Sequence, residues 1–286
     1  SSNNTLSNII SNSNKYGITL SSSSKNILIN TTTNSNSQCG IYFNVGQDNI
    51  LINTTTNSNS KCGIYFESSS NNNILINTTT NSNSQRGIYF VSSSNNTFNN
   101  FNIWNCSTGG LYSCIYVDES DYNIFDGGFI NKSSKYGVWI VSSGSSSTSN
   151  TDHNIFMNIN ITNITNTSVF LDDDGSNSEN LNNTFINVSY NNQTVDSRSE
   201  LIRKWYHQAY VNDSNGNPLN NANVVFYDNY SSNLRGNLTT NSSGWTNIGE
   251  IIEYIKISGN TIYYNNYSIF AYNSTHVGNV SFNVSL

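Results

Sequence analysis

Apolar and polar residues alternate along this chain in short runs that return at a regular interval. The word NILINTTTNSNS occupies residues 26–37, 49–60 and 73–84 without a single change. Its first residues alternate apolar and polar side chains, which is the pattern of a half-buried β-strand. A second run, GIYF, follows at residues 40–43, 63–66 and 87–90. The pattern predicts about three short strands per repeat, separated by turns rich in Asn and Ser.

The register of the repeat continues through eight copies. The period is roughly 22–24 residues and lengthens toward roughly 30 in the later copies, which is too short for helical hairpins. One aligned column contains only asparagine: Asn4, Asn26, Asn49, Asn73, Asn96, Asn123, Asn154 and Asn183. Two residues later comes an apolar column: Leu6, Leu28, Leu51, Leu75, Phe98, Phe125, Phe156 and Phe185. These columns predict a parallel β-helix of about eight coils, in which each residue stacks on its equivalent at about 4.8 Å.

The asparagine columns have a structural explanation. An Asn at a turn tolerates a left-handed backbone and can hydrogen-bond the Asn of the coils above and below it. Most other side chains at a buried bend would leave polar groups unpaired. The repeated word therefore predicts a ladder that holds the coils together.

Residues 1–195 resemble the right-handed parallel β-helix repeats of archaeal cell-surface proteins and bacterial adhesins. Coils of that family read N-x-[apolar]-x-N followed by G-[apolar]-x-[apolar], as residues 26–30 and 40–43 do here. The resemblance implies the fold and a surface location. It does not imply one activity, because the same scaffold carries lyases, hydrolases, phage tailspikes and inert fibres.

The repeat ends before residue 207, and residues 207–286 read as alternating strands of a small β-sandwich. This part resembles the carboxypeptidase-regulatory-like or Ig-like family, through Val211, Asp213, Gly216, Pro218, Leu219, Ala222 and Val224. The family's later T-D-x-x-G loop has Asn241 in place of Asp, which puts a role of that acidic side chain in doubt. Residues 196–206 are the densest charge cluster, and we expect a capping linker there, with a recognition patch as the alternative.

Composition narrows the possible partners. The 286 residues include 11 Lys and Arg against 17 Asp and Glu, for a net charge of −6. Without a basic patch, nucleic acid is a poor partner, and no apolar run is long enough to span a membrane. The first residues, SSNNT, are typical of a processed, secreted chain. We expect an extracellular or cell-surface protein without a cofactor.

Four cysteines fit the same location. Cys39 and Cys62 occupy one position on adjacent coils, about 5 Å apart, which is within disulfide range. Cys106 and Cys114 bracket an enlarged loop. We expect both pairs to be disulfides, with buried free thiols as the alternative.

Glycosylation sequons are numerous, but little more so than the composition dictates. The candidates for a carried glycan are Asn131, Asn160, Asn166, Asn212, Asn237 and Asn273. Asparagines within a ladder should remain unmodified.

Candidate catalytic and metal residues lie between residues 150 and 179. Asp152 and Asp173, about one coil apart, resemble the N-T-D and D-D motifs of polygalacturonase-type enzymes, but the G-H-G and R-I-K motifs of that family are missing. A simpler interpretation is that Asp152, His153 and Asp173 are polar turn residues. A weaker alternative is a Ca²⁺ site formed by Asp172, Asp173, Asp174 and Glu179. We therefore expect no catalytic residue and no metal.

Outward-facing apolar residues mark a candidate interface. The middle residues of the GIYF-type runs form an aromatic stripe of Tyr42, Tyr65, Tyr89, Tyr116, Trp139 and Phe170, and Ile27, Ile50 and Ile74 form a second strip. Such strips indicate an interaction surface unless later loops or the sandwich cover them. The sequence favours a non-enzymatic, self-associating and glycosylated subunit of an extracellular filament, sheath or surface layer. A carbohydrate-binding adhesin is the alternative, and a polysaccharide hydrolase or lyase comes third.

Overall fold

A computed structural model describes residues 1–106, 110, 112–144, 149–175, 178–264, 266–274 and 277–284. It divides the chain into two compact units, residues 1–201 with 257–259, and residues 202–256 with 260–286. Every regular element among the described residues is a β-strand. No helix there is long and apolar enough to cross a membrane. The predicted all-β architecture is confirmed.

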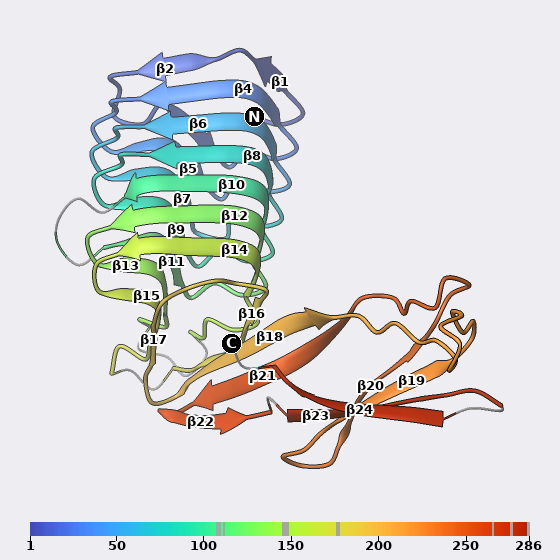
Figure 1. The fold of residues 1–286 in the computed structure, drawn as a ribbon. Coiled ribbons are helices and arrows are strands. Elements are labelled where there is room, and N and C mark those ends of the chain that lie inside the picture. Colours follow the sequence, from blue (N-terminus) through green and yellow to red (C-terminus); the bar gives the residue numbers. More distant parts are fainter. Residues whose placement is uncertain are drawn as a thin grey trace. The chain divides into compact units, whose positions relative to one another are not determined.

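The first unit is a right-handed parallel β-helix of about eight coils, whose strands stack as successive rungs in Figure 1. The long sheet contains β1 (Thr5–Ser7), β2 (Ile10–Asn12), β4 (Ile27–Asn34), β6 (Ile50–Asn57), β8 (Ile74–Asn81), β10 (Thr97–Cys106), β12 (Ile124–Ser133), β14 (Ile155–Ile164) and β16 (Asn180–Ile186). Each of these strands pairs in parallel with its counterpart one coil away. Leu51 therefore pairs with Leu28 and with Leu75, as the aligned column predicted.

The second sheet of the solenoid has eight strands. It contains β3 (Ile18–Ser21), β5 (Cys39–Asn44), β7 (Cys62–Glu67), β9 (Arg86–Val91), β11 (Ser113–Asp118), β13 (Tyr136–Val141), β15 (Thr167–Asp172) and β17 (Gln193–Val195). A glycine precedes the apolar residues because the coils approach closely there. A Cβ built on Gly63 would lie 2.6 Å from the carbonyl oxygen of Gly87 on the next coil. Only glycine fits this position without a shift of the backbone.

The solenoid core consists of stacked side chains of one kind. Phe43, Phe66 and Phe90 of the eight-stranded sheet stack with ring centroids 4.4 and 4.6 Å apart. On the long sheet, a second column contains Phe98, Phe125, Phe156 and Phe185. These rings are fully buried. Each buried ring contributes about 1.5–3 kcal/mol of transfer free energy, so the aromatic columns are a major apolar part of the core of a largely polar chain.

Two asparagine ladders run along the solenoid. The inner ladder is the column from Asn4 to Asn183, which is buried from Asn26 onward. Each amide nitrogen Nδ2 donates to the next Oδ1 at 2.9–3.1 Å. The outer ladder contains Asn8, Asn30, Asn53, Asn77 and Asn100, then Asn158 and Asn187. Where Gly127 interrupts the outer ladder, Asn158 donates instead to Asp126.

Different positions adopt the left-handed backbone and form the buried hydrogen bonds, although one turn asparagine was expected to do both. The outer-ladder asparagines take the left-handed backbone, with φ near 55° at Asn30 and Asn77. The inner-ladder asparagines do not, and the residue before each of them does, as at Lys25 and His153. The inner ladder therefore supplies hydrogen bonds alone, because the strained turn position lies one residue earlier.

Both expected disulfides are formed. The Cα atoms of Cys39 and Cys62 are 4.5 Å apart, and those of Cys106 and Cys114 are 5.2 Å apart. The first joins neighbouring coils, and the second closes a loop that contains residues outside the described range.

The second unit is built around an antiparallel sheet in the order β20-β19-β23-β24. Its strands are β18 (Ser199–His207), which begins in the first unit, β19 (Asn223–Asp228), β20 (Leu234–Thr239), β21 (Gly249–Ile257), β22 (Asn260–Tyr263), β23 (Asn266–Tyr272) and β24 (Val277–Asn283). Val224, Phe226, Ile251, Tyr267 and Ile269 form its core. The segment 196–206, expected to be a capping linker, thus contains most of β18.

Two turns of the second unit follow the residues that carried the family resemblance. Asp213 Oδ1 accepts hydrogen bonds from the backbone N–H groups of Asn215 and Asn217 at 2.8 and 2.9 Å. Asn241 Oδ1 accepts from the backbone of Ser243 and Trp245 at 2.9 and 3.2 Å. Asn241 therefore makes the turn bonds that a carboxylate makes at Asp213, without a charge.

Candidate functional site

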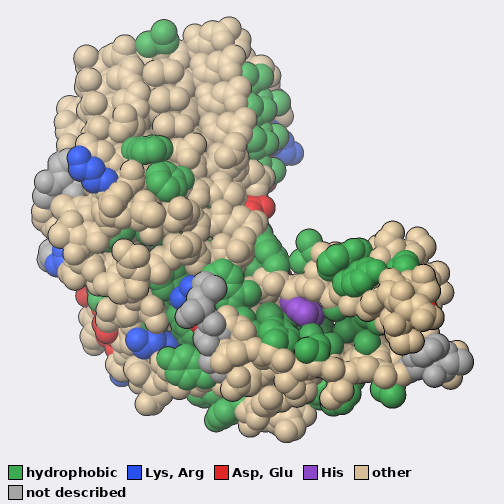
Figure 2. Space-filling view, viewed as in Figure 1, with side chains coloured by type: hydrophobic (Ala, Val, Ile, Leu, Met, Phe, Trp, Pro, Cys, Tyr) green, Lys and Arg blue, Asp and Glu red, His purple; other side chains and the backbone are tan. Residues whose placement is uncertain are grey.

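The outer face of the eight-stranded sheet carries the aromatic stripe predicted from the sequence. Tyr42 pairs in register with Tyr65, Tyr65 with Tyr89, and Tyr116 with Trp139. We call Tyr42, Tyr65, Tyr89, Tyr116, Trp139 and Phe170 the ring column. These side chains are half-buried, except Tyr116, which is buried. The face of the long sheet in Figure 2 differs, because mostly polar side chains cover it.

The rings at the start of the column face one another. Tyr16 and Tyr42 stack with centroids 4.5 Å apart, and Tyr65 and Tyr89 stack at 4.4 Å with an interplanar angle of 7°. Their flat faces are therefore covered, and solvent meets ring edges and hydroxyl groups. In these coils the stripe therefore offers ring edges, and not ring faces, to a ligand.

The stacking direction changes at Tyr116. Its ring stands at 74° to Tyr89 and at 86° to Trp139, and the centroids are 5.2 and 5.0 Å apart. Edge-to-face contacts of this kind are favourable because a positive ring edge meets a negative ring face. The ring column therefore has a stacked part from Tyr42 to Tyr89, which Tyr16 extends, and a crossed contact on either side of Tyr116. Beyond it, Trp139 and Phe170 stack again, with centroids 6.0 Å apart and an interplanar angle of 24°.

A carboxylate is held on one flank of the stacked part. Glu67 accepts hydrogen bonds from the hydroxyls of Tyr42 and Tyr65, the latter at 2.9 Å. Burial and then this hydrogen bond raise the pKa of both tyrosines above the usual value of 10.0. The two phenols stay protonated at any physiological pH, and the carboxylate is engaged with protein donors.

The other flank of the stacked part is a groove of about 290 Å³. Its floor contains the Cys39–Cys62 disulfide. The lining side chains are Tyr16, Gln38, Lys61, Tyr65, Gln85, Arg86 and Tyr89. We call this hollow the Tyr–Arg groove. Among the described residues, no hydrogen bond or ion pair is formed by the side chains of Gln38, Lys61 and Gln85. The groove thus joins an apolar floor to polar groups that are free to bind a ligand.

Larger hollows lie in the second unit. One of about 470 Å³ is lined mainly by apolar residues such as Val211, Ile269 and Phe282, together with His207. Burial lowers the pKa of His207, which stacks on Phe282, so the imidazole is neutral at pH 7. The lining contains no acidic or strongly basic side chain. We therefore give more weight to the smaller Tyr–Arg groove, where charged and aromatic groups converge.

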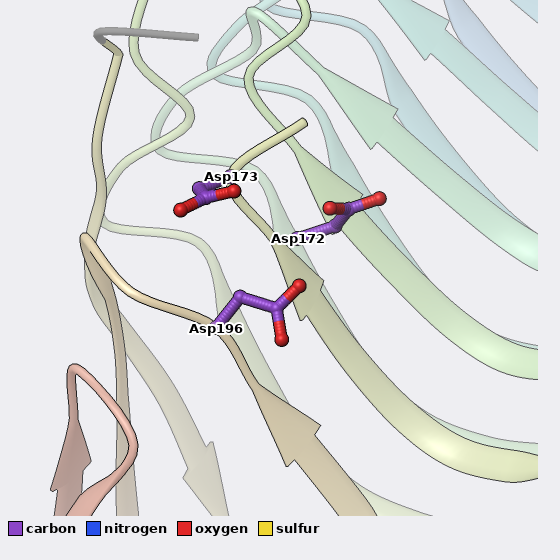
Figure 3. A group of neighbouring side chains, drawn as sticks. All are labelled: Asp172, Asp173 and Asp196. Atoms are coloured by element: carbon purple, nitrogen blue, oxygen red, sulfur yellow. The ribbon is translucent and has the colours of Figure 1, made fainter. Parts of the chain in front are cut away.

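Three carboxylates gather on the same sheet at the far end of the ring column. Asp172 ends β15, Asp173 follows it, and Asp196 comes directly after β17 (Figure 3). One oxygen from each lies within 4.8 Å of the others. The indole Nε1 of Trp139 donates to Asp172 Oδ2 at 3.2 Å. This acid group is therefore in contact with the ring column.

The three acids titrate differently. Burial raises the pKa of Asp172, and burial with the negative charges of Asp172 and Asp173 raises that of Asp196. Asp173 is the opposite case, because hydrogen bonds from the hydroxyl of Ser197 and the backbone of Gly175 lower its pKa. Such a group can share a proton between Asp172 and Asp196, or bind a hard cation through its oxygens.

The expected calcium ligands come together only in part. Asp172 and Asp173 belong to the acid group, but Asp196 takes the place expected for Asp174 and Glu179. The backbone N–H of Asp174 donates to Asp172 Oδ1 at 3.0 Å, and its side chain is exposed. Asp196 lies one coil further along the solenoid, and strand register could have placed it there, since Leu171 pairs with Val195.

Asp152 lies apart from the acid group. Its Oδ1 accepts from the backbone of Leu181, and its own backbone N–H donates to Asp121 Oδ1 at 2.7 Å. These bonds join the turns of successive coils. His153 occupies the left-handed position of that turn and stacks on Tyr122. Burial raises the pKa of Asp121 and Asp152. The structure therefore does not pair Asp152 with Asp173.

The remaining predicted residues lie at the surface to different degrees. Of the glycan candidates, Asn160, Asn166, Asn212 and Asn237 are exposed, and Asn131 and Asn273 are half-buried. Ile27 and Ile50 are half-buried, and Ile74 is 38% exposed. Their glycosylation and their role in an interface stay predictions.

Arg86 is the residue of the groove that sequence reasoning missed. Its signal was nevertheless present, because Arg86 occupies the position of Cys39 and Cys62 in the next coil, as the pairing of Cys62 with Arg86 shows. A cation that replaces a half-cystine in an otherwise constant repeat is a departure from the structural pattern.

Comparisons with known proteins agree with the architecture. A family model described as right handed beta helix region matches residues 1–113. No curated protein matches the sequence. The catalytic domain of an alpha-1,3-glucanase in complex with nigerose has a TM-score of 0.54 and 16% identity, over 68% of this chain and 41% of its own.

Two further solved structures are less similar. The A-module of the Azotobacter vinelandii mannuronan C-5 epimerase has a TM-score of 0.46 and 13% identity, over 69% of this chain and 56% of its own. An Acinetobacter phage tailspike has a TM-score of 0.42 and 12% identity, over 98% of this chain and 62% of its own. The chain thus spans less than two thirds of the length of each of these structures.

The expectation of a chain without enzymatic activity is wrong. It rested on motifs that are missing from one type of β-helix hydrolase, whereas the glucanase domain is catalytic and has the same fold at 16% identity. Missing motifs of one enzyme family do not exclude catalysis on this scaffold. The right-handed parallel β-helix is confirmed.

Proposed function

We propose that the solenoid binds a polysaccharide in the Tyr–Arg groove, on the outer face of its eight-stranded sheet. The observation that carries this proposal is the lining of the groove, where tyrosine edges and a disulfide floor meet polar side chains that have no partner in the described chain. Its volume of about 290 Å³ lies near the lower end of the range of about 300–1,000 Å³ that is common for ligand sites. Apolar surface with a few placed polar groups suits a sugar, which has both C–H and hydroxyl surfaces.

A polymer suits the groove better than a single sugar. Gln38, Lys61 and Gln85 lie on three successive coils, joined by backbone hydrogen bonds of 2.9 Å from Lys61 to Gln38 and 2.8 Å from Gln85 to Lys61. The repeat thus presents similar groups at each coil step of about 4.8 Å. A chain of similar units can meet the same environment more than once.

The test is binding of the full chain to a panel of polysaccharides by affinity electrophoresis. We expect retention of the wild type by at least one polymer. A variant with Lys61→Ala and Gln85→Ala should bind that polymer about tenfold more weakly, because it loses hydrogen bonds to a ligand. Lys25→Ala is the matched control, since Lys25 is exposed and does not line the groove. Equal binding by the wild type and the double variant would place the ligand elsewhere.

A second candidate function is cleavage of the bound polymer at the acid group. The observation that favours it is the raised pKa of both Asp172 and Asp196, whose carboxyls lie beside Trp139 of the ring column. A carboxyl that keeps its proton next to one that loses it provides an acid and a base at the same place.

Release of reducing ends from a bound polymer tests the cleavage proposal. We expect Asp172→Asn and Asp196→Asn to abolish release and to leave retention of the polymer unchanged. Asp152→Asn should keep the activity, because Asp152 lies in a turn ladder away from the acid group. Addition of Ca²⁺ distinguishes proton transfer from cation binding as the role of the acids. A cation bound there would inhibit proton transfer between them. No release from any bound polymer would reject cleavage and leave the binding proposal intact.

We also propose an extracellular location. Two disulfides within the described chain support it, because such bonds form and persist in oxidising compartments. Fractionation of the source cells followed by peptide detection would test this location directly.

A further inference from the structure

We infer that the Tyr–Arg groove selects an acidic polysaccharide, whose carboxylate or sulfate group is held by Arg86 with Lys61. This inference rests on the proposed binding function and adds the chemical class of the ligand. The observation behind it is the environment of Arg86, a cation that three aromatic rings surround at the edge of the groove.

Aromatic rings position Arg86, and no acid among the described residues pairs with it. Its guanidinium carbon lies 4.3 Å from the ring centroids of both Tyr89 and Tyr116, and 5.2 Å from that of Tyr112. Its Nε is buried and has no hydrogen-bond partner among the described residues. The side chain forms no ion pair in the described part of the chain. The rings thus stabilise the charge, while the Nε donor has no partner in the described part of the chain.

Unused guanidinium donors in a fixed plane are suited to an oxyanion. Arginine presents its N–H groups in a planar fork that matches the two oxygens of a carboxylate or sulfate. Cation–π contact with Tyr89 and Tyr116 restrains that plane before a ligand arrives. The entropy cost of ordering the side chain is therefore met in the free protein.

Positive charge continues along the same flank of the ring column. Lys61 lines the groove, and the Lys15 ammonium lies 5.5 Å from the ring centroid of Tyr16, which also lines it. In a chain with 11 basic residues and a net charge of −6, three of them on one flank favour an anion at that flank.

The nearest acids lie on the opposite flank and have protein partners. Glu67 accepts from the hydroxyls of Tyr42 and Tyr65. Asp118 accepts from the backbone and the hydroxyl of Ser143 at 2.9 and 2.6 Å, and burial raises its pKa. A polymer with its acid groups turned toward Arg86 avoids both carboxylates.

The experiment compares two pairs of polymers, and each pair has one backbone in an acidic and an uncharged form. Binding of the wild-type full chain is measured by isothermal titration to polygalacturonate, its fully methyl-esterified form, a sulfated galactan and an uncharged galactan. We expect binding to polygalacturonate or to the sulfated galactan to be at least about tenfold tighter than to the matched uncharged polymer. The pair with the larger ratio of acidic to uncharged affinity identifies carboxylate or sulfate as the ligand group.

Variants then assign the difference to Arg86. Arg86→Gln should remove most of the preference for the acidic polymer, measured as the ratio of the affinities for the acidic and the matched uncharged polymer. Lys25→Gln is the control, because it removes one positive charge from an exposed side chain outside the groove. Arg86→Lys keeps the charge and tests the planar fork. If the melting temperature shows that Arg86→Gln does not fold, Arg86→Lys replaces it in the test. Its preference for the acidic over the uncharged polymer should then be reduced.

Each outcome has a distinct meaning. Equal affinity of the wild type for the acidic and uncharged polymers would overturn the selectivity and leave the binding proposal in place. A preference for acidic polymers that both Arg86 variants retain would also overturn the inference. If no polymer of either kind binds, the proposed function itself fails, and the acidic specificity fails with it.

Discussion

At the scale of single residues, most positions of this chain are explained by the residue stacked one coil away. Asn73 donates to Asn96 and accepts from Asn49, and Tyr65 stacks on Tyr89. The residues that we propose to be functional depart from this stacking of equivalent residues. Arg86 replaces a half-cystine in register, and Asp196 adds a third carboxylate to Asp172 and Asp173.

The sequence predicts where the columns of stacked residues lie, but not how their side chains are oriented or which of them come together. The position of the ring column followed from the spacing of the GIYF runs, and it is confirmed by the register of β5 to β13. Ring orientation could not be predicted, because it depends on side-chain torsions that the spacing does not determine. The acid group was predicted with Asp174 and Glu179 in place of Asp196, because residues near in sequence were preferred to a residue one coil away.

The acid group makes the stability of the chain depend on pH in a specific direction. Asp196 has a pKa raised above 3.8 by burial and then by Asp172 and Asp173. Since the folded state binds its proton more tightly than the unfolded state, stability falls as the pH rises through the folded pKa. We expect Asp196→Asn to raise the melting temperature at pH 7 by about 2 °C.

The control for this prediction is the same comparison of the variant with the wild type at low pH. Below the ordinary carboxyl pKa of 3.8, Asp196 is protonated in both states, and the variant and wild type should melt together. Differential scanning calorimetry between pH 3 and pH 7 gives both values. A lower melting temperature of Asp196→Asn at pH 7 would show that the carboxylate is stabilising, as it would be in the presence of a bound cation.

At the scale of elements, the inner and outer asparagine ladders perform different tasks with the same residue. The inner ladder is buried, and loss of one amide leaves donors of the neighbouring coils unsatisfied. The outer ladder is exposed, and its task is to hold the left-handed bend within each long strand. The sequence predicted an asparagine ladder but assigned the hydrogen bonds and the left-handed backbone to the same residue.

A pair of substitutions on one coil separates these tasks. Asn73→Ala should lower the free energy of unfolding by about 1–3 kcal/mol, because the amide and backbone N–H groups of Asn49 lose their acceptor. Asn77→Gly is the matched control at an exposed position with φ of 55°, and glycine accepts this conformation readily. Urea unfolding measures both, and a loss at Asn77→Gly as large as that at Asn73→Ala would contradict the division of tasks.

At the scale of the whole molecule, we propose that copies of this chain associate through the outward isoleucines of β4, β6 and β8. Ile27 and Ile50 are half-buried, and Ile74 is 38% exposed, so a neighbouring copy can remove further apolar surface from water. Light scattering at rising concentration should show a growing mass for the wild type. Ile74→Lys should shift that growth to higher concentration, and a wild type that stays monomeric throughout would reject the association.

The central claim is that a polysaccharide occupies the Tyr–Arg groove, and hydroxyl-radical footprinting of the full chain with and without polygalacturonate tests it most directly. Tyr65 and Tyr89 line the groove, whereas Trp104 and Tyr122 are 43% and 51% exposed outside it and serve as internal controls. The account predicts that polymer reduces oxidation of Tyr65 and Tyr89 while oxidation of Trp104 and Tyr122 is unchanged. Protection of Trp104 or Tyr122, with Tyr65 and Tyr89 oxidised as in the free chain, would contradict it.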